Sequence, residues 1–370
     1  MTSPAAVDTE FETFFLPGPT AVHPDVLAAM SRQMIAHRGK GFEAMFAGIQ
    51  EGLRDVFRTA RGVYVSSSSA TGLMEASVRC APPGAVLAVV NGAFSERYAQ
   101  IAASCGRELH VLNVPWGRAA DPADVRAALG ARRYGVLTVV HSETSTGALS
   151  DVRTIAALAR EAGVCCLVDS VTGVGGTPLH TDDWELDFAL TGSQKALALP
   201  PGMAFGVASP AYVATIKQAP NRGLYFDLAE FEEFLPKNQT PNTPALPLLF
   251  ALDAQLGRIR AETMEARWAR HAAMAERTYA WVAERAERFG LGILAPEGER
   301  SPTVTVVTVP KSITGDDVVK GCLKRGWTIG GGHGKLRAVS FRIGHMGDHT
   351  VDELERCLEV CDAALADALG

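Results

Sequence analysis

The sequence predicts an α/β protein in which a mostly parallel sheet, flanked by helices, forms a large domain and a small α+β domain follows. Short apolar runs alternate with amphipathic stretches from about residue 25 to 215, and each run ends in small polar residues. Strands that are apolar on both faces are typical of a parallel sheet covered by helices. The 370 residues exceed what one hydrophobic core normally organises, so we expect two domains.

Five runs have the pattern of buried strands: GVYVSS, AVLAVVN, GVLTVVHS, VCCLVDS and FALTGS. Between the third and the fourth, VRTIAALAREAG places apolar residues three and four positions apart, which predicts an amphipathic helix. In such sheets ligands bind beyond the carboxyl ends of the strands. The polar strand ends are therefore candidate walls of one site.

A loop rich in Pro and Asn, PKNQTPNTPALP, separates this region from the rest of the chain. Residues 246–290 have the periodicity of a long helix, PTVTVVTVP and VSFRIGHMG alternate as strands do, and a helix is expected in SITGDDVVKGCLKRG. We predict an N-terminal arm over residues 1–20, a large domain over 21–262 and a small α+β domain over 263–370.

The composition is that of a globular protein. Hydrophobic residues make up 47% and charged residues 21%, and a net charge of -6 argues against a general nucleic-acid surface. No apolar stretch is long enough for a membrane span, and the start of the chain lacks a secretion-signal pattern, so we expect a cytoplasmic protein. The seven cysteines include no CxxC pair, which favours reduced, structural thiols, and we expect no metal site.

Two glycine-rich segments imitate nucleotide-binding motifs without the residues that these motifs need. GGGHGKL at 330–336 has Ile329 where a P-loop has its first glycine, and Leu336 replaces the metal-binding Ser or Thr. TGVGGTP at 172–178 has Pro178 in place of the third glycine of a dinucleotide fingerprint. We expect turns in both.

Asp169 and Lys195 are the residues that most directly suggest chemistry, because each follows a predicted buried strand. A buried lysine can lose its proton and attack an aldehyde. A buried carboxylate can pair with a protonated pyridine nitrogen. Taken singly, Lys195 would be a solvated loop lysine and Asp169 a cap or turn residue. Their combination at adjacent strand ends favours a reactive site.

The blocks FFLPGPTAVHPDVLAAMSRQMIAHRGKGFE, VHSETSTG, LVDSVTGVGG, TGSQKAL and FRIGHMG occur in this order over nearly the whole chain. In these blocks the sequence resembles the class V, fold-type I aminotransferases, particularly the alanine–glyoxylate and serine–glyoxylate group. The resemblance implies pyridoxal 5'-phosphate as cofactor, with Lys195 as its Schiff-base lysine and Asp169 as partner of its pyridine nitrogen. It also implies ping-pong transfer of an amino group from alanine or serine to a 2-oxo acid such as glyoxylate or pyruvate.

The same blocks imply further contacts with the cofactor. A small-residue turn that opens a helix offers N–H donors to a phosphate, and the resemblance assigns this turn to Ser69, Ala70 and Thr71, which could equally form an ordinary N-cap. Phe94 would stack on the pyridine ring, although a lone Phe is more often core. The remaining implied contacts are Thr144 with the phenolic oxygen, Val171, and Gln194 with the phosphate.

In the family, the segment that matches NQTPNTP crosses to the cofactor phosphate of a neighbouring subunit. Thr240 and Thr243 are the candidates for this contact, with Thr243 the better aligned. A Pro-rich linker between domains is the structural alternative. If the resemblance holds here, the active unit is a homodimer.

Arg342 would bind the substrate carboxylate, because a planar guanidinium matches it with two parallel hydrogen bonds. Strand alternation places Arg342 opposite Phe341 and Ile343, away from the apolar side. A surface arginine is the structural alternative. Gly18, in the first block, is a further substrate-binding candidate.

Two other reactions share the fold. AHRGKGFE matches a block of phosphoserine aminotransferases, in which His37 and Arg38 would contact the distal phosphate of the substrate. Alternatively, Arg38 caps a helix or pairs with Glu43. A lyase such as a cysteine desulfurase would need a mobile nucleophilic cysteine, and Cys322 lies in a segment that is predicted to be helical.

Overall fold

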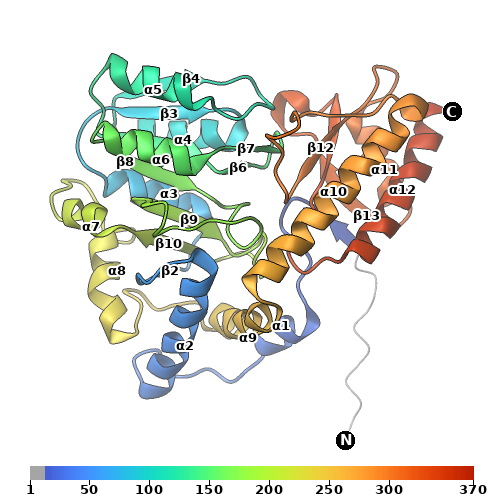
Figure 1. The fold of residues 1–370 in the computed structure, drawn as a ribbon. Helices are drawn as coiled ribbons and strands as arrows, with labels where there is room; N and C mark the ends of the chain where they lie inside the picture. Colours follow the sequence, from blue (N-terminus) through green and yellow to red (C-terminus); the bar gives the residue numbers. More distant parts are fainter. Residues whose placement is uncertain (1–12) are drawn as a thin grey trace, which may run out of the picture.

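The computed structural model describes residues 13–370, in which two large sheets lie next to each other (Figure 1). The seven-stranded sheet has the order β2-β10-β9-β8-β5-β3-β4. Its strands are β2 (Tyr64–Ser66), β3 (Val86–Val90), β4 (Leu109–Asn113), β5 (Val136–Val140), β8 (Cys165–Asp169), β9 (Phe188–Gly192) and β10 (Ala204–Ala208). A short hairpin, β6 (Ser142–Glu143) and β7 (Ala148–Leu149), follows β5.

The seven-stranded sheet is mostly parallel, as predicted. Strands β4, β3, β5, β8 and β9 run parallel to one another, whereas β10 is antiparallel to both β9 and β2. All five predicted strands are present, as β2, β3, β5, β8 and β9. The prediction missed β4, which is half exposed at the edge of the sheet, and β10, which is rich in small residues.

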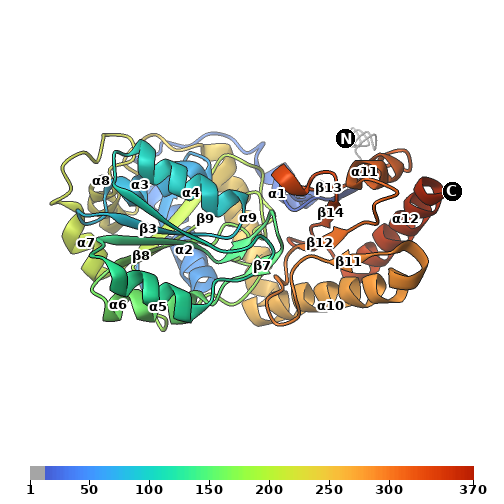
Figure 2. The same cartoon turned by 90° about the horizontal axis from the view of Figure 1, so that it is seen from above.

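Helices cover both faces of this sheet, and Figure 2 shows α3 and α4 on one side with α5 and α6 on the other. Alternate strand residues face different cores: Val136 packs with one helix layer, and Leu137 and Val139 pack with the other. One layer comprises α3 (Ala70–Arg79), α4 (Ala93–Ser104), α7 (Pro210–Ile216) and α8 (Leu228–Phe234). The other comprises α1 (Pro24–Ala29), α2 (Lys40–Phe57), α5 (Pro122–Ala131), α6 (Val152–Glu161) and α9 (Leu246–Glu262). A short 3-10 helix, η1 (Leu235–Lys237), follows α8.

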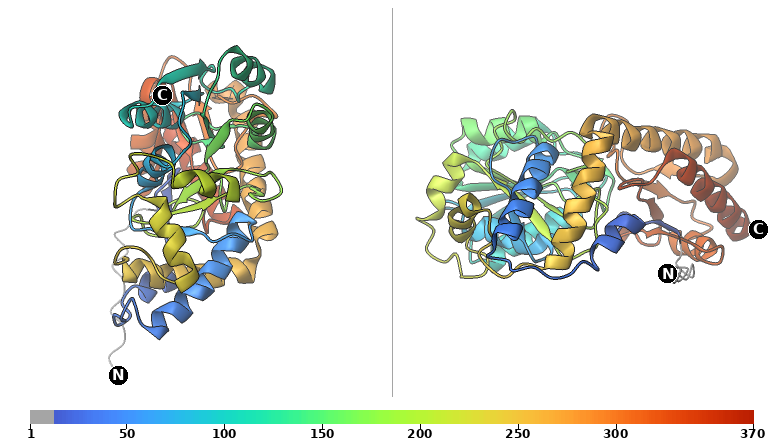
Figure 3. Two further views of the ribbon diagram at one scale, coloured as in Figure 1. Left: turned by 90° about the vertical axis from the view of Figure 1, so that its left-hand side faces the viewer. Right: turned by 90° about the horizontal axis from the view of Figure 1, so that it is seen from below.

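The five-stranded sheet has the order β1-β13-β14-β12-β11 and its own apolar core, which includes Trp281, Phe341 and Leu358. Figure 3 shows α10 and α12 beside it, at the opposite end of the molecule from α7 and α8. Its strands are β1 (Thr13–Phe15), β11 (Gly292–Ile293), β12 (Thr305–Thr308), β13 (Trp327–Gly331) and β14 (Ser340–Ile343). Its helices are α10 (Met264–Phe289), α11 (Gly315–Leu323), α12 (Val351–Leu369) and the 3-10 helix η2 (Gly334–Leu336).

Two predictions need correction. The predicted arm over residues 1–20 is wrong for residues 13–15, because β1 pairs in parallel with β13 and Phe15 is fully buried there; residues 1–12 lie outside the described residues. The single long helix over residues 246–290 is two helices, α9 and α10. Thr263 separates them with a φ of 71° and caps α10 by accepting a hydrogen bond from Ala266 N. The exact domain boundaries stay a prediction.

The two rejected motifs form no nucleotide-binding loop. Residues 172–178 are a series of turns, and residues 330–336 comprise the end of β13, a short loop and η2. Within residues 13–370, no helix combines the length and the apolarity that a membrane crossing requires.

Candidate active site

A cavity of about 280 Å³ lies at the carboxyl ends of β5, β8 and β9, where the sheet topology predicts a ligand. The starts of α3 and α4 close it from the side. Nine of the predicted cofactor residues line it: Ser69, Ala70, Thr71, Phe94, Thr144, Asp169, Val171, Gln194 and Lys195. The other lining residues are Met74, Arg97, Val140, Ser142 and Thr172.

Lys195 is 8% exposed, and its Nζ donates a hydrogen bond to the carbonyl of Pro17 at 2.5 Å. Burial lowers the pKa of Lys195 to about 8, and the positive charge of Arg342 adds to this effect, while Asp169 and Glu143 oppose it. An amine with this pKa is partly neutral near physiological pH. Lys195 can therefore act as a nucleophile or as a base.

Gly18 lies against the side chain of Lys195. A Cβ on Gly18 would be 2.3 Å from Lys195 Cδ, and the φ of Gly18 is 97°, so only glycine fits here without strain. The structure thus places this predicted substrate residue beside the lysine, in the connection that follows β1.

Asp169 is 2% exposed, and its Oδ1 accepts a hydrogen bond from Val171 N at 2.8 Å. Burial raises the pKa of Asp169 to about 7, in spite of this hydrogen bond. A nearby cation would stabilise the ionised carboxylate and lower the pKa again. Asp169 is thus suited to a cationic group of a ligand.

The start of α3 offers a site for an anion. Ser69 is the N-cap of α3, but its side chain makes no capping hydrogen bond, and Ala70 and Thr71 form the first turn beside the cavity. Gln194 lies close to this turn. A Cβ on Gly192 would be 2.8 Å from Gln194 Oε1 and 3.5 Å from the Cβ of Ala70, so a glycine leaves room for the glutamine.

Phe94, on the first turn of α4, presents a flat ring to the cavity. Lys195 Nζ lies 5.9 Å from the centroid of this ring, and Arg97 lies 5.4 Å from it. The ring of His333 stacks on Phe94, with centroids 5.5 Å apart and an angle of 21° between the planes. Sequence reasoning missed Arg97, although it follows Phe94 by one turn of α4, and it missed His333 because no local spacing connects residue 333 with residue 94.

Two further buried residues were also missed: Glu143, behind the cavity, and Thr172, in its wall. Glu143 is fully buried and accepts hydrogen bonds from Phe94 N at 3.3 Å and Ser95 N at 2.9 Å, so it holds the start of α4. The hydroxyl of Thr172 forms a short hydrogen bond with that of Thr144. Glu143 and Thr172 lie in the polar segments that follow β5 and β8. The polarity of these segments was the only feature of the sequence that could have identified them.

Arg342 comes from β14 of the smaller sheet. Its neighbours Phe341 and Ile343 are fully buried, so strand alternation turns Arg342 to the other side, as expected. Its Nε donates to the carbonyl of Gly331 at 2.7 Å and its Nη1 to that of Thr144 at 3.3 Å. Burial lowers the pKa of Arg342 to about 10, although the charge of Glu143 opposes this. This arginine lies next to the cavity and can receive a carboxylate.

His37, Arg38, Thr240 and Thr243 do not line this cavity. The guanidinium of Arg38 donates to the carbonyl of Thr240 at 2.6 Å and that of Pro241 at 3.0 Å, so Arg38 holds this loop. Glu43 pairs with Lys40 instead of Arg38. Thr240 is buried, whereas Thr243 is exposed. Within this chain, these four predicted residues are thus not part of the cavity wall.

The cavity combines four groups that suit pyridoxal 5'-phosphate. The uncapped start of α3 matches a phosphate, Phe94 matches a flat ring, Asp169 matches a pyridinium nitrogen and Lys195 matches an aldehyde. The donor set thus fits this cofactor as the sequence predicts.

Comparison with known proteins gives the same result. The family model described as aminotransferase class-V matches residues 14–345. An uncharacterized aminotransferase of Methanocaldococcus jannaschii is 35% identical over 350 residues, which are 92% of this chain and 89% of the relative. The serine–glyoxylate aminotransferase of Methylorubrum extorquens is 31% identical over 349 residues, or 90% and 86% of the two chains. The crystal structure of an alanine–glyoxylate aminotransferase from Nostoc sp. has a TM-score of 0.90 at 30% identity, covering 100% of this chain and 98% of its own. The resemblance is confirmed, and the chain belongs to the class V aminotransferases, which are pyridoxal-phosphate-dependent transaminases of fold type I.

Proposed function

We propose that this transaminase moves the amino group of alanine or serine to glyoxylate or pyruvate. The names of the serine–glyoxylate and alanine–glyoxylate relatives support this choice of substrates. The observation that carries the proposal is one cavity in which Lys195, with a pKa of about 8, and Asp169 lie close to an arginine that can receive a carboxylate.

Each residue has a defined task in this reaction. When bound, the cofactor supplies the electron sink that stabilises negative charge on the substrate's α-carbon. Lys195 Nζ removes the proton from this α-carbon in the first half of the reaction. In the second half it delivers a proton to the α-carbon of the amino acid that is formed. Asp169 holds the pyridine nitrogen in its protonated form, and Arg342 orients the substrate through its carboxylate.

A screen of amino donors tests this proposal. Purified protein would receive alanine, serine, aspartate, phosphoserine or cysteine, each with glyoxylate, pyruvate or 2-oxoglutarate. We expect keto-acid formation with ping-pong kinetics, fastest with alanine or serine and glyoxylate. Phosphoserine as the preferred donor, or sulfide release from cysteine, would contradict the proposal.

The two alternatives have less support. Arg38, the candidate for a substrate phosphate, is engaged with the loop at Thr240 and Pro241 of its own chain. Cys322, the candidate for a desulfurase nucleophile, is fully buried in α11, and its Sγ lies 3.8 Å from that of Cys361. The neighbouring Cys361 and burial both raise the pKa of Cys322, so this thiol is a poor nucleophile.

We also propose a homodimer in which Thr240 and Thr243 contact the cofactor phosphate of the neighbouring subunit. The exposure of Thr243 and the three hydrogen bonds from Arg38 to residues 239–241 support a rigid loop that presents polar groups outward. Mixing Lys195→Ala subunits with Thr240→Ala/Thr243→Ala subunits should restore activity, because one site of each heterodimer then carries neither defect. No recovery after confirmed subunit exchange would contradict shared sites.

The proposed compartment is the cytoplasm. The seven cysteines of this chain are all unpaired, as in a reducing environment. Fractionation of cells that express a tagged chain would test this assignment, and recovery outside the cytoplasmic fraction would contradict it.

A further inference from the structure

Three consecutive carbonyl groups around Lys195 are each bound by a donor from a distant part of the chain. Thr20 N donates to the carbonyl of Gln194 at 3.1 Å, and Thr20 Oγ1 donates to that of Lys195 at 3.1 Å. Arg267 Nη2 donates to the carbonyl of Ala196 at 2.7 Å. The backbone that carries the reactive amine is therefore held by the connection after β1 and by α10.

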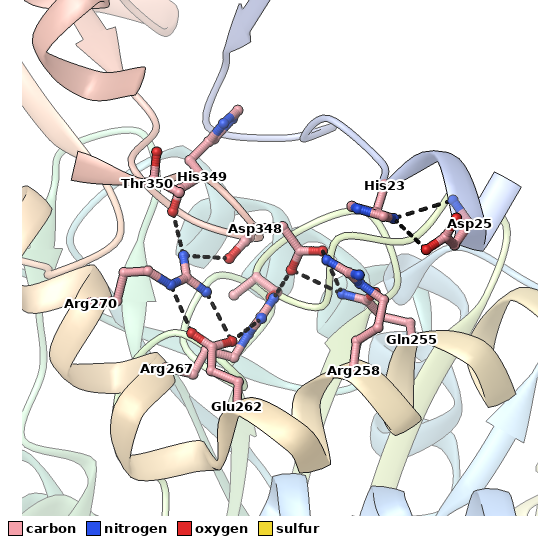
Figure 4. Close-up of polar contacts among 12 residues, drawn as sticks. His23, Asp25, Gln255, Arg258, Glu262, Arg267, Arg270, Asp348, His349 and Thr350 are labelled. Carbon is pink, nitrogen blue, oxygen red and sulfur yellow. Dashed lines mark hydrogen bonds and ion pairs between the residues drawn. The ribbon is translucent and has the colours of Figure 1, made fainter. Parts of the chain in front are cut away.

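Arg267 joins this backbone to two acidic residues (Figure 4). The side chain is 2% exposed, its Nη1 donates to Glu262 Oε2 at 2.8 Å, and the same Nη2 that binds Ala196 donates to Asp348 Oδ1 at 2.8 Å. A guanidinium is planar and rigid, so it fixes the positions of its three acceptors relative to one another. Because the guanidinium is buried, the loss of one partner leaves a poorly compensated charge.

Asp348 belongs to the segment that follows Arg342. Residues 344–347 between β14 and Asp348 are all buried. A Cβ on Gly347 would be 3.2 Å from Thr20 Oγ1 and 3.4 Å from the Cβ of Ala198. The segment that would bind the substrate carboxylate is thus packed against the donors and the loop that hold Lys195.

We propose that Arg267 is a positioning residue for Lys195. Its guanidinium sets the position of the lysine backbone through the carbonyl of Ala196 and ties it to Glu262 and Asp348 at the junction of the two sheets. The proposal rests on the reactive role of Lys195 proposed above. It assigns to α10 a function in the orientation of the amine, in addition to its contribution to the core.

Arg270 provides a matched control. It lies one turn further along α10, binds the same Glu262 with its Nε at 2.7 Å, and donates to the carbonyls of Gly347 and His349. It makes no hydrogen bond to residues 194–196 among those that the structure describes. Arg267→Lys and Arg270→Lys therefore both disturb the contacts of Glu262. Only Arg267→Lys also removes the guanidinium that binds the carbonyl of Ala196.

The experiment measures how fast cofactor-free protein attaches pyridoxal phosphate covalently, with borohydride trapping and mass spectrometry at Lys195. At a pH above 9, where the amine of Lys195 is neutral, Arg267→Lys should slow attachment roughly tenfold to a hundredfold, the factor that a hydrogen bond from a charged donor is worth. Arg270→Lys should stay within about twofold of the parent. In turnover, Arg267→Lys should lower kcat with little change in the KM of the amino donor. Thermal unfolding of both variants checks that they are folded.

Equal rates for the parent and Arg267→Lys, or equal slowing by both variants, would overturn the proposal. If Arg267→Lys does not fold, Asp348→Asn retains the arginine and removes one of the two carboxylate charges that orient it. Asp348→Asn should also slow the attachment of the cofactor, by a smaller factor than expected for Arg267→Lys. An unchanged rate would overturn the proposal. Attachment of the cofactor at a residue other than Lys195 in the parent would overturn the proposed function as well, so the two failures are distinguishable.

Discussion

Two aspartates near Lys195, Asp169, which is buried, and Asp348, which is partly buried, have opposite electrostatic surroundings. Asp169, in the cavity, is bound by the backbone N–H of Val171, and burial raises its pKa to about 7. Asp348, between the two sheets, accepts hydrogen bonds from Arg267 and Gln255 (Figure 4). Burial alone would raise the pKa of Asp348, but the charge and the hydrogen bond of Arg267 bring it below its ordinary value.

The difference between Asp169 and Asp348 suggests how a charged group that serves a ligand can be distinguished from one that serves the fold. A buried charge that the protein itself neutralises serves the architecture, as in the group formed by Arg267, Glu262 and Asp348. A buried charge without a strong partner costs free energy, which a ligand of opposite charge can recover. Asp169 and Lys195 are of the second kind.

The largest expected effect concerns the cavity amine. Lys195→Ala should abolish turnover, because it removes the amine that we assign to the transfer of the α-carbon proton, and borohydride should no longer fix the cofactor to the protein. Lys335→Ala, at an exposed lysine over the ring of Trp116, is the control and should remain active. Steady-state assays and mass spectrometry after reduction measure both effects. Near-normal transamination by Lys195→Ala would disprove the central assignment.

The next effect concerns the cavity carboxylate. Asp169→Asn should lower kcat roughly 100- to 1000-fold, the usual cost of losing one preorganised electrostatic partner. The amide has nearly the same shape but carries no charge to pair with a pyridinium nitrogen. Kinetics with a saturating amino donor measure the loss. A decrease of less than tenfold would mean that Asp169 is not the partner of this nitrogen.

The comparison becomes sharper when the same substitution is made at both aspartates in cofactor-free protein. At pH 8 the carboxylate of Asp169 is ionised in the unfolded chain as well, so folding has to bury this charge, and Asp169→Asn should stabilise the protein by roughly 2–4 kcal/mol. Asp348→Asn should destabilise it by roughly 1–3 kcal/mol, because a charged hydrogen-bond acceptor is lost. Unfolding in urea measures both free energies.

The pH dependence of these effects also differs. The folded-state pKa of Asp169 is raised from the ordinary value of 3.8 to about 7. The stability gained by Asp169→Asn should therefore increase as the pH rises from 3.8 to about 7, and it should be absent below pH 3.8. The folded-state pKa of Asp348 is lowered, so the loss should be complete above 3.8 and shrink as the pH falls below it. Effects of the same sign at pH 8 would break the distinction between the two sites.

The smallest expected effect is a shift in the titration of Lys195. Covalent attachment of the cofactor needs the neutral amine, so its rate should rise with a midpoint at a pH of about 8. Burial is the main cause of this low pKa, and Arg342 adds to it, so Arg342→Gln should raise the pKa and move the midpoint to higher pH. Arg337→Gln, at an exposed arginine paired with Asp316, should leave it unchanged. An unmoved midpoint in Arg342→Gln would mean that burial alone sets the pKa.

Local pattern was sufficient for much of the fold. The runs that became β3, β5, β8 and β9 are mostly apolar because both faces of these strands are covered, and this property is visible in a short window. β4 was missed because its edge position leaves it half exposed. The break at Thr263 was missed because helical periodicity continues on both sides of it.

The sequence by itself determined that Asp169 and Lys195, the proposed reactive pair, share one cavity, since both stand at strand ends that a parallel sheet must bring to one edge. The blocks shared with the family determined the cofactor and most residues of the cavity wall. Three contacts were decided only by the tertiary structure. Arg38 donates to the carbonyl of Thr240, His333 stacks on Phe94, and Arg267 donates to the carbonyl of Ala196. The last contact joins residues 71 positions apart. Such contacts depend on how separately folded elements pack, and no short-range pattern in the sequence records which donor meets which carbonyl.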